Sequence, residues 1–486
     1  MQTHLSKDYD GRHLIVVASY QSYRRDQVEI DNVVPSWYYN VLDEGHLIKN
    51  PKTSTYRAVT SIHSKHRIVL TGTPIQNDVI EIWPLFHFLL PGGLGTARSF
   101  DQKYTKHVRA LRSAGKRSTK RMREEYILAV EDLHVRVSPM ILRRTKIEVA
   151  LDLPEKTIQN VMCEKSEQQE KHFVRFVEAE VLERNEGKDK TSPLVRMQYL
   201  RLLCSHPTLV SPVMSPKNTE KANVRHSGKM VALLRLLAEA GIGNGPPKDD
   251  EKEILESTFT APTDGWSHKV LIFTHFKKTL EYLEKSVFGV HLKGIKYIRL
   301  DGGVAPKHRG AVVSNFNNSK DVACLLTTTR TGGVGLTLTA ADTVIFLEPD
   351  WNPTVDAQAM DRAHRIGQKK TVSVYRLITA GTLEEQIMDV QAFKINTARD
   401  VLSGVQSTEC GGGGETSSIS LKTNRDVGLT GDALPFNIHG GATLSFSSSS
   451  SGGSGGSGGS GSAIHKVEEE YELYDIEKFV TRLNNQ

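Results

Sequence analysis

Two carboxylates stand next to each other in the sequence LDEGH at residues 42–46, directly after the apolar run WYYNV. If that run is a strand of a parallel sheet, Asp43 and Glu44 lie at its carboxyl end, where such sheets bind their ligands. Asp43 could then hold Mg²⁺ through water, and Glu44 could orient and deprotonate the attacking water. An ordinary acidic turn after a strand explains the same letters, and for this pair alone it is the commoner explanation.

A second candidate segment is LTGTPIQN at residues 70–77, which also follows an apolar run. The hydroxyls of Thr71 and Thr73 and the backbone around Gly72 could sense the γ-phosphate of a nucleotide and couple it to movement between lobes. A strand-ending turn is the commoner fate of Gly-Pro clusters, so this segment is also ambiguous by itself.

Glycines follow a predicted strand again in RTGGVGLTLTAAD at residues 330–342. Because glycine has no side chain, such residues let backbone amides approach phosphate groups closely, as in other anion-binding turns. A tight strand-to-helix connection explains these glycines equally well.

The last candidate residues for this chemistry are two arginines in the sequence DRAHRIGQ at residues 361–368. Arg362 and Arg365 are three positions apart, which places them on one face of a predicted helix. Two guanidinium groups on one face suit bidentate phosphate contacts, and either could act as an arginine finger. The usual explanation of paired arginines is a solvated, charged helix.

These residues need a scaffold that brings strand ends together, and the apolar runs predict one. Short β-rich runs at 13–20, 37–44 and 66–73 alternate with helical patterns, which predicts a parallel α/β sheet. Between about residues 100 and 230 helical and basic patterns replace the strand signal. A second α/β series then follows, with strands predicted at 269–276, 296–302, 322–329, 342–350 and 372–379.

The helical stretch carries a basic segment between residues 103 and 123. Its members are Lys103, Lys106, Arg109, Arg112, Lys116, Arg117, Lys120, Arg121 and Arg123. Such a segment could follow a DNA backbone. A solvated helix or loop is an explanation of at least equal weight.

Composition narrows the class of protein. The 486 residues are 38% hydrophobic and 24% charged, which fits a folded, multi-domain protein. A formal charge of +6 permits a polyanionic partner without requiring one. Four widely separated cysteines predict neither a disulfide framework nor a zinc site, and they fit a reducing compartment. No apolar run approaches the roughly 18 residues that a membrane span needs.

The composition changes sharply after about residue 405. Residues 406–462 are rich in Gly, Ser and Thr, which predicts a flexible, disordered tether, either native or introduced. In the last segment, 463–486, four apolar residues recur at helical spacing and predict an amphipathic helix that docks within this chain or on another. They are Ile476, Phe479, Val480 and Leu483.

Each of these segments is ambiguous by itself, but the order in which they follow one another along the chain is informative. The series is DEGH, LTGTPIQN, ILRRTKIEVALDLPEK (141–156), LRLLCSHP (200–207), YIRLDG, GGVGLTLTAADTVIF and DRAHRIGQ. Between about residues 13 and 405 it resembles the Swi/Snf-type branch of the superfamily-two helicase-like ATPases, which are double-stranded DNA translocases. The segments at 91–104, 236–245, 381–394 and 474–483 further resemble the subgroup of these ATPases that removes TATA-binding protein from DNA.

The resemblance implies an α/β fold with two RecA-like parallel-sheet lobes that close on ATP and Mg²⁺. It implies that Asp43 holds the Mg²⁺, that Glu44 activates water, and that Arg362 and Arg365 contact phosphate. It also implies roles in ATP coupling for Thr71, Gly72, Thr73 and Gln368. Contacts to the DNA strand would come from Thr328, Gly332 and Gly333.

A cellular setting follows from the same resemblance. It implies a nuclear DNA-dependent ATP hydrolase that acts in transcription regulation, with double-stranded DNA as its partner and no membrane. TATA-binding protein would be gripped by regions outside this chain.

We therefore predict five segments along the chain. They are a partial first lobe at 1–105, a helical and basic insertion with the interlobe connection at 106–226, a second lobe at 227–405, the disordered linker at 406–462 and the C-terminal helix at 463–486.

The sequence departs from the family pattern in two places. No GxxxxGK[ST] phosphate loop occurs in it, so we expect a motor whose front part is missing and whose ATP binding is badly impaired. His275 stands where the family usually has Gln. Two alternatives stay open: a non-catalytic DNA-binding or regulatory remnant of such a motor, and a chromatin-remodelling ATPase of another subgroup.

Overall fold

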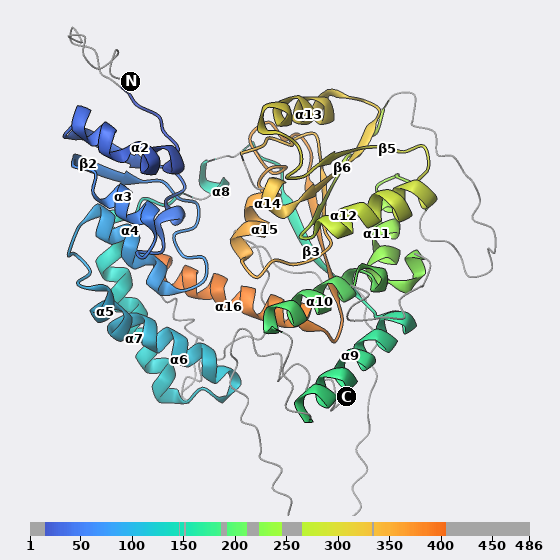
Figure 1. Cartoon of the computed structure of the whole chain (residues 1–486), viewed down its shortest axis with the longest axis horizontal. Helices are drawn as coiled ribbons and strands as arrows, with labels where there is room; N and C mark the ends of the chain where they lie inside the picture. The colour runs from blue at the N-terminus through green and yellow to red at the C-terminus, as the bar shows by residue number, and fades with distance from the viewer. Residues whose placement is uncertain are drawn as a thin grey trace, which may run out of the picture.

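The computed structural model describes the chain as two lobes connected by one long helix (Figure 1). The described residues are 15–144, 146–149, 152–185, 192–210, 223–244, 265–332 and 335–404. The predicted linker at 406–462, the predicted helix at 463–486 and Gly333 lie outside them. None of the described helices is both long and apolar enough to cross a membrane.

The first lobe contains a parallel pair of strands, β1 (Trp37–Leu42) and β2 (Ser64–Val69), which confirms the strands predicted at 37–44 and 66–73. The two strands are in register, and Leu42 lies opposite Val69 at their carboxyl ends. The surrounding helices are α2 (Tyr20–Val33), η1 (Gly45–Ile48), α3 (Ser54–Thr60), η2 (Val79–Glu81) and α4 (Ile82–Leu89). This register places LDEGH beside LTGTPIQN.

The strand predicted at 13–20 is wrong over its described part, because α2 begins at Tyr20 and the residues just before it have no strand pairing. The Ser19 side chain accepts a hydrogen bond from a backbone amide in the first turn, which is the N-cap contact that starts a helix. Ile15 and Val17 are 83% and 93% exposed. The apolar run therefore has no strand or core to pack on in the described molecule.

A group of helices completes the first lobe. These are α5 (Ala97–Phe100), η3 (Asp101–Thr105), α6 (Lys106–Ala114), η4 (Gly115–Arg117), α7 (Lys120–Val137) and η5 (Ser138–Met140). Of these, α5, η3, α6 and α7 share one hydrophobic core with α4, in which Phe88, Phe100 and Leu133 are fully buried. The short α8 (Lys146–Val149) lies in the connection to the second lobe.

The second lobe is built on a six-stranded parallel sheet with the order β3-β8-β7-β4-β6-β5. The strands are β3 (Lys156–Cys163), β4 (Val270–Thr274), β5 (Lys296–Leu300), β6 (Val322–Thr328), β7 (Thr343–Phe346) and β8 (Val372–Thr379). The last five confirm the five strands predicted for this lobe.

Helices cover both faces of this sheet. One face carries α9 (Glu167–Asn185), α10 (Pro193–Ser205), η6 (Pro207–Leu209), η7 (Val224–His226), α11 (Gly228–Glu239), α12 (Lys277–Tyr282) and η8 (Leu283–His291). The other carries α13 (Pro306–Asn318), α14 (Thr329–Gly332) and α15 (Pro353–Met360). β4 and β7 are buried along their whole length, as central strands of a doubly covered parallel sheet must be.

The stretch 106–226, predicted as one insertion, divides between the lobes. Its helices up to Met140 pack in the first lobe, whereas β3, α9 and α10 belong to the core of the second. The sequence did not predict β3, because it is an edge strand that pairs with β8 alone. Of its eight residues, Cys163 is the one that is buried, so KTIQNVMC lacks a continuous apolar run.

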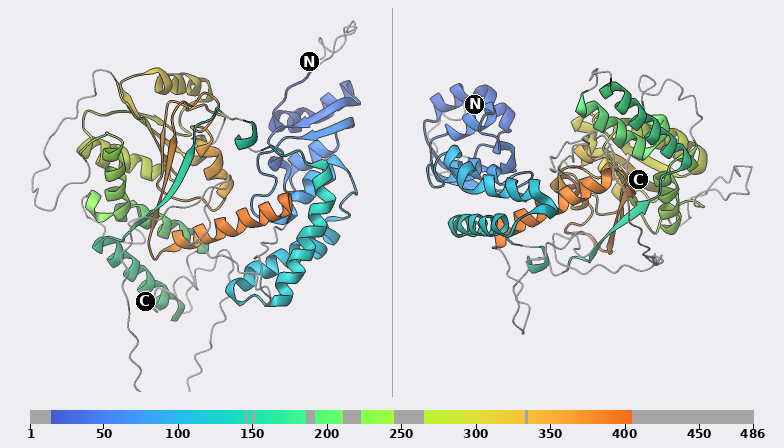
Figure 2. Two further views of the ribbon diagram at one scale, coloured as in Figure 1. Left: turned by 180° about the vertical axis from the view of Figure 1, so that it is seen from behind. Right: turned by 90° about the horizontal axis from the view of Figure 1, so that it is seen from below.

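One helix, α16 (Leu383–Ser403), joins the two lobes (Figure 2). Its 21 residues span about 31 Å at ~1.5 Å per residue. Leu383 and Ile387 at its start are buried in the core of the second lobe, and Val401 near its end is buried in the core of the first. The helix therefore belongs to both cores.

The start of α16 is anchored by a buried ion pair. Lys229 Nζ lies 2.6 Å from Glu384 Oε1, and both side chains are fully buried. Lys229 also donates to the Leu347 carbonyl at 2.5 Å, and Glu384 Oε2 accepts a 2.9 Å bond from the Thr379 amide. Each charge in this pair has a partner, so removing one charge leaves the other buried without a counter-charge.

We predict that Glu384→Gln lowers the free energy of unfolding by about 3–5 kcal/mol, because it leaves the Lys229 ammonium buried without a counter-charge. Urea unfolding followed by circular dichroism measures the decrease. Glu281→Gln, an exposed position on α12, is the matched control and should change the midpoint little. Equal midpoints for the two variants would contradict the anchoring role.

Candidate active site

The end of β1 carries the acidic pair where the sequence predicts it. Asp43 and Glu44 follow the last residue of the strand with exposed side chains. The Tyr20 hydroxyl donates a 2.7 Å hydrogen bond to the Asp43 carbonyl, and the Glu44 amide donates a 2.9 Å bond to Asp43 Oδ1. Burial, and then the charges of Asp43 and Glu44, raise the pKa of Tyr20 to about 12, so its hydroxyl remains a donor.

Glu44 has a left-handed backbone, with φ 50° and ψ 52°, and is the one non-glycine residue with positive φ in the described part of the chain. Such a conformation is costly for an ordinary side chain and is concentrated at functional sites. The Gly45 amide donates a 2.9 Å bond to the Leu70 carbonyl, and a Cβ at Gly45 would lie 2.2 Å from Val69 Cγ1. Glycine is therefore required for β1 to turn this close to β2.

A histidine lies beside the acidic turn. Glu44 Oε2 is 3.2 Å from Nδ1 of His46. Burial lowers the pKa of His46 below its ordinary value, and the nearby Glu44 charge opposes this shift without reversing it. At neutral pH the ring is therefore neutral, and the contact is not an ion pair.

The 71–77 loop follows β2 and lies next to the acidic turn. Thr71 Oγ1 accepts a 3.2 Å bond from the Thr73 amide, and Thr73 Oγ1 accepts a 3.3 Å bond from Gln76 Nε2. Both threonines are half-buried, whereas Gly72 is exposed and a Cβ there would meet no atom within 4 Å. The loop therefore has an open side at Gly72.

The two candidate arginines do not lie on a helix, so this prediction is wrong. α15 ends at Met360, and the residues 361–368 form successive turns. The Arg362 carbonyl accepts a 2.9 Å bond from the Leu338 amide, and Gly367 has a φ of 101°, which ends any helical continuation.

Tertiary contacts from the interlobe connection account for these turns. Asp361 Oδ1 lies 2.7 Å from Lys146 Nζ and 3.7 Å from Lys156 Nζ. The His364 ring nitrogen Nε2 lies 2.7 Å from the Pro154 carbonyl. These contacts draw the segment toward the connection and override the helical pattern of its sequence.

Arg362 lies within electrostatic range of the acidic turn of the other lobe. Burial, and then the charge of Arg365, lower the pKa of Arg362, while Asp361 and Glu44 act in the opposite direction. Because Glu44 belongs to the other lobe, its effect means that the two side chains are within electrostatic range. Arg365 is exposed, and its Nη1 donates a 3.4 Å bond to Thr337 Oγ1.

Gln368, predicted to take part in ATP coupling, is buried, and its side chain is fully hydrogen-bonded within the second lobe. Its Nε2 donates to the carbonyls of Ala341 at 2.8 Å and Ala363 at 3.2 Å. Its Oε1 accepts bonds from the amides of Lys369 at 2.8 Å and Lys370 at 3.0 Å. The side chain therefore braces the turns that carry the arginines, which would make any coupling role indirect.

The predicted DNA-strand residues lie at the end of β6. Thr328 Oγ1 donates to Thr331 Oγ1 at 3.0 Å and is half-buried. Gly332 is buried, and a Cβ there would lie 2.5 Å from Phe273 Cε1. Close packing therefore explains Gly332 by itself, and Gly333 lies outside the described residues.

A basic cleft that the sequence did not predict lies nearby in the second lobe, with a volume of about 520 Å³. It is lined by Leu194, Met197, Gln198, Arg201, His275, Phe276, Lys277, Arg330 and Trp351. These residues come from α10, from the loop after β4 together with the start of α12, from α14 and from the loop after β7. No local pattern joins these four segments, so the fold alone brings them together.

Both cations and aromatic rings line the walls of this basic cleft. The Arg201 guanidinium lies 5.2 Å from the centre of the Phe276 ring, and its Nη2 donates a 2.8 Å bond to the Pro349 carbonyl. Lys277 and Arg330 are exposed. Such a surface suits a polyanion that also carries flat rings.

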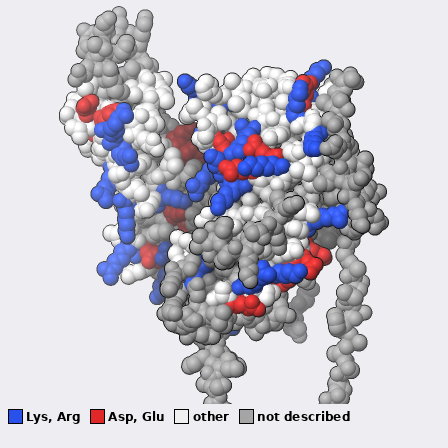
Figure 3. All heavy atoms as spheres, turned by 45° about the vertical axis from the view of Figure 1, so that its right-hand side comes forward, with Lys and Arg blue, Asp and Glu red and all other residues white. Residues whose placement is uncertain are grey.

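Several cations of the basic segment at 103–123 are paired with acidic side chains. Arg109 Nε lies 2.7 Å from Asp78, Lys103 Nζ lies 2.8 Å from Asp132, and Arg121 Nε lies 2.8 Å from Glu125. On the face that Figure 3 displays, acidic side chains likewise lie beside basic ones in several places. These pairs favour the solvated, charged helix over a DNA-tracking segment.

The donor set at the acidic turn fits a magnesium–nucleotide complex. Among the described residues no group of three or more His, Cys, Asp or Glu could hold a metal by itself. Mg²⁺ usually takes one or two carboxylates and completes its shell with water and substrate phosphates. Asp43 supplies hard oxygen atoms of that kind, and Thr71 and Thr73 follow the neighbouring strand β2, whose end lies opposite the end of β1.

The chain matches two protein-family models, the SNF2-related domain over residues 2–209 and the Helicase conserved C-terminal domain over residues 252–367. It is 42% identical over 424 residues to TATA-binding protein-associated factor 172 of Homo sapiens, covering 82% of this chain and 22% of that protein. It is 38% identical over 515 aligned residues to TATA-binding protein-associated factor BTAF1 of Arabidopsis thaliana, covering 98% of this chain and 24% of that protein.

The chain therefore spans less than a quarter of the length of these curated relatives. Among solved structures, the Sulfolobus solfataricus SWI2/SNF2 ATPase core in complex with dsDNA is 31% identical, with a TM-score of 0.37. That comparison covers 75% of this chain and 68% of the other.

We predict that Gly45→Ala destabilises the first lobe by about 1–3 kcal/mol, because the new methyl group overlaps Val69. Gly72→Ala is the matched control and should change stability by less than about 0.5 kcal/mol, since its Cβ meets no neighbour. Thermal unfolding by differential scanning calorimetry compares the two. A Gly45→Ala protein as stable as the control would contradict the close turn described here.

Proposed function

The chain belongs to the Swi/Snf family of helicase-like ATPases, and from this premise we propose that it forms part of a motor that hydrolyses ATP and tracks along double-stranded DNA. One observation carries the proposal: Glu44 at the end of β1 and Arg362 after α15 come from different lobes and lie within electrostatic range of each other. A phosphate bound there would contact an activating carboxylate and a stabilising guanidinium together.

In this proposal each residue has a distinct task. Asp43 holds the Mg²⁺ of the nucleotide through water, and bound Mg²⁺ supplies charge neutralisation for the phosphates. Glu44 orients the attacking water and takes its proton. Arg362 and Arg365 stabilise negative charge on the phosphate oxygens, and the 71–77 loop responds to the γ-phosphate through Thr71, Gly72 and Thr73.

The basic cleft supports DNA as the track. Its exposed Lys277 and Arg330 are suited to phosphate oxygens, and its aromatic side chains offer surfaces for sugars and bases. Thr328 and Gly332 lie at the neighbouring strand end, and together with Gly333 they are proposed to contact the same DNA strand. Binding through the backbone would be independent of sequence and sensitive to salt.

The names of the two relatives point to a target. Both are called TATA-binding protein-associated factors, and the match covers most of this chain. We infer that the motor acts in the nucleus on TATA-binding protein bound to DNA, as part of transcription regulation. Contacts with TATA-binding protein are assigned to regions outside this chain.

A second candidate function has one specific observation in its favour. No GxxxxGK[ST] segment occurs among the 486 residues, so the chain does not itself supply the usual cradle for the β- and γ-phosphates. A DNA-binding or regulatory protein without ATP turnover is therefore the competing proposal.

We predict that Glu44→Gln lowers DNA-stimulated ATP hydrolysis by about 10²–10⁴-fold, because the amide cannot accept the proton of the attacking water. The measurement is phosphate release, with and without duplex DNA, by the purified protein at the length found in the cell. Glu29→Gln, an exposed glutamate on α2, is the control and should keep full activity. Strong DNA binding without any hydrolysis by the unaltered protein would favour the non-catalytic proposal.

We predict that the double substitution Lys277→Ala, Arg330→Ala weakens duplex DNA binding equally for all sequences. The negative slope of log K against log salt concentration should become less steep by about 1 for each DNA phosphate that the protein no longer neutralises. Fluorescence anisotropy over a salt series measures it. Lys307→Ala, an exposed lysine on α13 away from the basic cleft, should leave the slope unchanged, and an unchanged slope in the double variant would rule out the cleft as the DNA site.

A further inference from the structure

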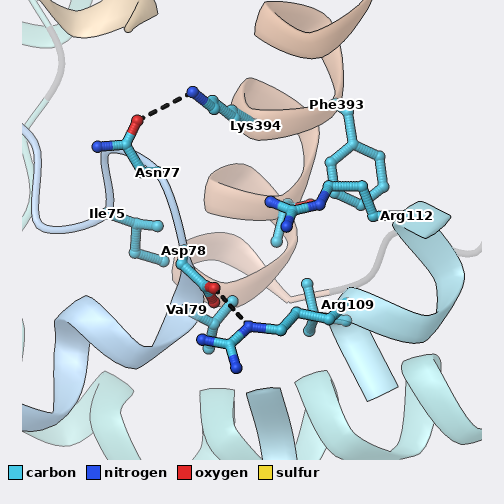
Figure 4. Close-up of a pocket in the computed structure, with 10 residues that line it drawn as sticks. Ile75, Asn77, Asp78, Val79, Arg109, Arg112, Phe393 and Lys394 are labelled. Carbon is cyan, nitrogen blue, oxygen red and sulfur yellow. Dashed lines mark hydrogen bonds and ion pairs between the residues drawn. The ribbon is translucent and has the colours of Figure 1, made fainter. Parts of the chain in front are cut away.

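One lysine at the centre of α16 connects the two lobes through polar contacts. The Lys394 side chain is 7% exposed, and its Nζ donates to Asn77 Oδ1 at 2.9 Å (Figure 4). It also donates to the Trp351 carbonyl at 2.7 Å. Asn77 ends the 71–77 loop of the first lobe, and Trp351 lines the basic cleft of the second. A single ammonium group thus joins the loop that follows β2 to the wall of that cleft.

The first-lobe end of this contact is held firmly. The Glu81 carboxylate accepts bonds from the amides of Gln76 at 2.7 Å and Asn77 at 3.0 Å, and it lies 3.2 Å from Lys49 Nζ. Asn77 therefore cannot move independently of the loop, and a shift of the loop moves the acceptor of the Lys394 contact.

A second polar contact runs beside the first. Gln76 Oε1 accepts a 2.8 Å bond from Lys49 Nζ and a 3.4 Å bond from Asn352 Nδ2, and Gln76 Nε2 donates to Thr73 Oγ1. Asn352 follows Trp351 in the same loop of the second lobe. The 71–77 loop and the 351–352 segment are therefore linked at two adjacent points.

The surroundings of Lys394 leave little room for water. A cavity of about 10 Å³ adjoins it, room for at most about one water molecule, with Ile75, Val79 and Phe393 among its walls (Figure 4). Burial is the main reason that the pKa of Lys394 falls to about 8. The charged groups that face it are Arg112 on α6, Glu81 on η2, Asp350 after β7 and Lys49 after η1.

Burying this ammonium costs free energy that an apolar side chain would avoid. Its two acceptors are a neutral amide and a backbone carbonyl, which compensate a buried charge less well than a carboxylate would. A methionine at this position would fill the same space without the desolvation cost. Stability alone therefore does not account for a lysine here, whereas a directional link between the lobes does.

We propose that Lys394 is a positioning residue that couples the 71–77 loop to the Trp351 wall of the basic cleft and so fixes the orientation of the two lobes. When the loop moves, Asn77 moves with it, and the pull is transmitted through Lys394 to α16 and Trp351. The claim that ATP drives this movement rests on the proposed function. The mechanical link between the lobes does not depend on it.

The mechanical link is tested by a distance between the lobes. Spin labels are attached at two exposed positions, Val28→Cys in α2 and Lys307→Cys in α13, and double electron–electron resonance measures the distance between them. The background protein carries Cys410→Ser and keeps its buried cysteines. Lys394→Met should broaden and shift the distance distribution. Arg399→Met, which removes an exposed cation from the same helix, is the matched control and should not.

The coupling is tested by a double-mutant cycle in the ATPase assay. Lys394→Met should lower the stimulation of kcat by DNA by about 5- to 150-fold, the usual range of coupling between sites, with an unchanged KM for ATP. Asn77→Ala should have the same effect, and the double variant should be no worse than either single one. Additive effects of the two substitutions, or full stimulation in Lys394→Met, would overturn the coupling.

The two assays separate the possible failures. If the unaltered protein does not hydrolyse ATP, the proposed function fails, and the distance measurement still decides the role of Lys394. If Lys394→Met gives the same distance distribution as the unaltered protein, the link itself is refuted whatever the ATPase shows. Circular dichroism of each variant confirms that a changed distance does not come from unfolding.

Discussion

Helix α16 buries Leu383 and Ile387 in the core of the second lobe and Val401 in the core of the first. This shared burial is the constraint on which the candidate site depends, because Glu44 and Arg362 come from different lobes. Each buried aliphatic side chain contributes about 1.5–3 kcal/mol, so both ends of the helix are firmly held. Its centre is held differently, by the directional polar contacts of Lys394 with Asn77 and the Trp351 carbonyl. Apolar packing therefore holds the helix at its ends, and polar contacts hold it in the middle.

The chemistry of the gap follows from where the strand ends lie. The tight turn at Gly45 and the left-handed backbone of Glu44 bring the acidic pair beside the end of β2. On the opposite side, the contact of Asp361 with Lys146 and the amide bonds of Gln368 hold the segment that carries the arginines. The acidic pair and the segment that carries the arginines thus come from different lobes, with Glu44 and Arg362 within electrostatic range of each other.

The sequence predicted the elements whose apolar runs are continuous, which are β1, β2 and five strands of the second sheet. It missed β3, because an edge strand buries one side chain in eight, and it predicted a strand before Tyr20 where the Ser19 cap starts a helix. It placed the acidic pair correctly, since a strand end is a local feature. It was wrong about the helix carrying Arg362, and it missed the basic cleft, because both depend on segments that are far apart in the chain.

The most direct test of the account is a cryo-electron microscopy structure of the protein, at the length found in the cell, with duplex DNA and a transition-state mimic of ATP hydrolysis. The account predicts that the phosphate mimic lies between the Asp43–Glu44 turn and Arg362, with α16 still packed on both lobes. A mimic bound away from Arg362, or lobes separated with α16 detached from the first, would contradict it.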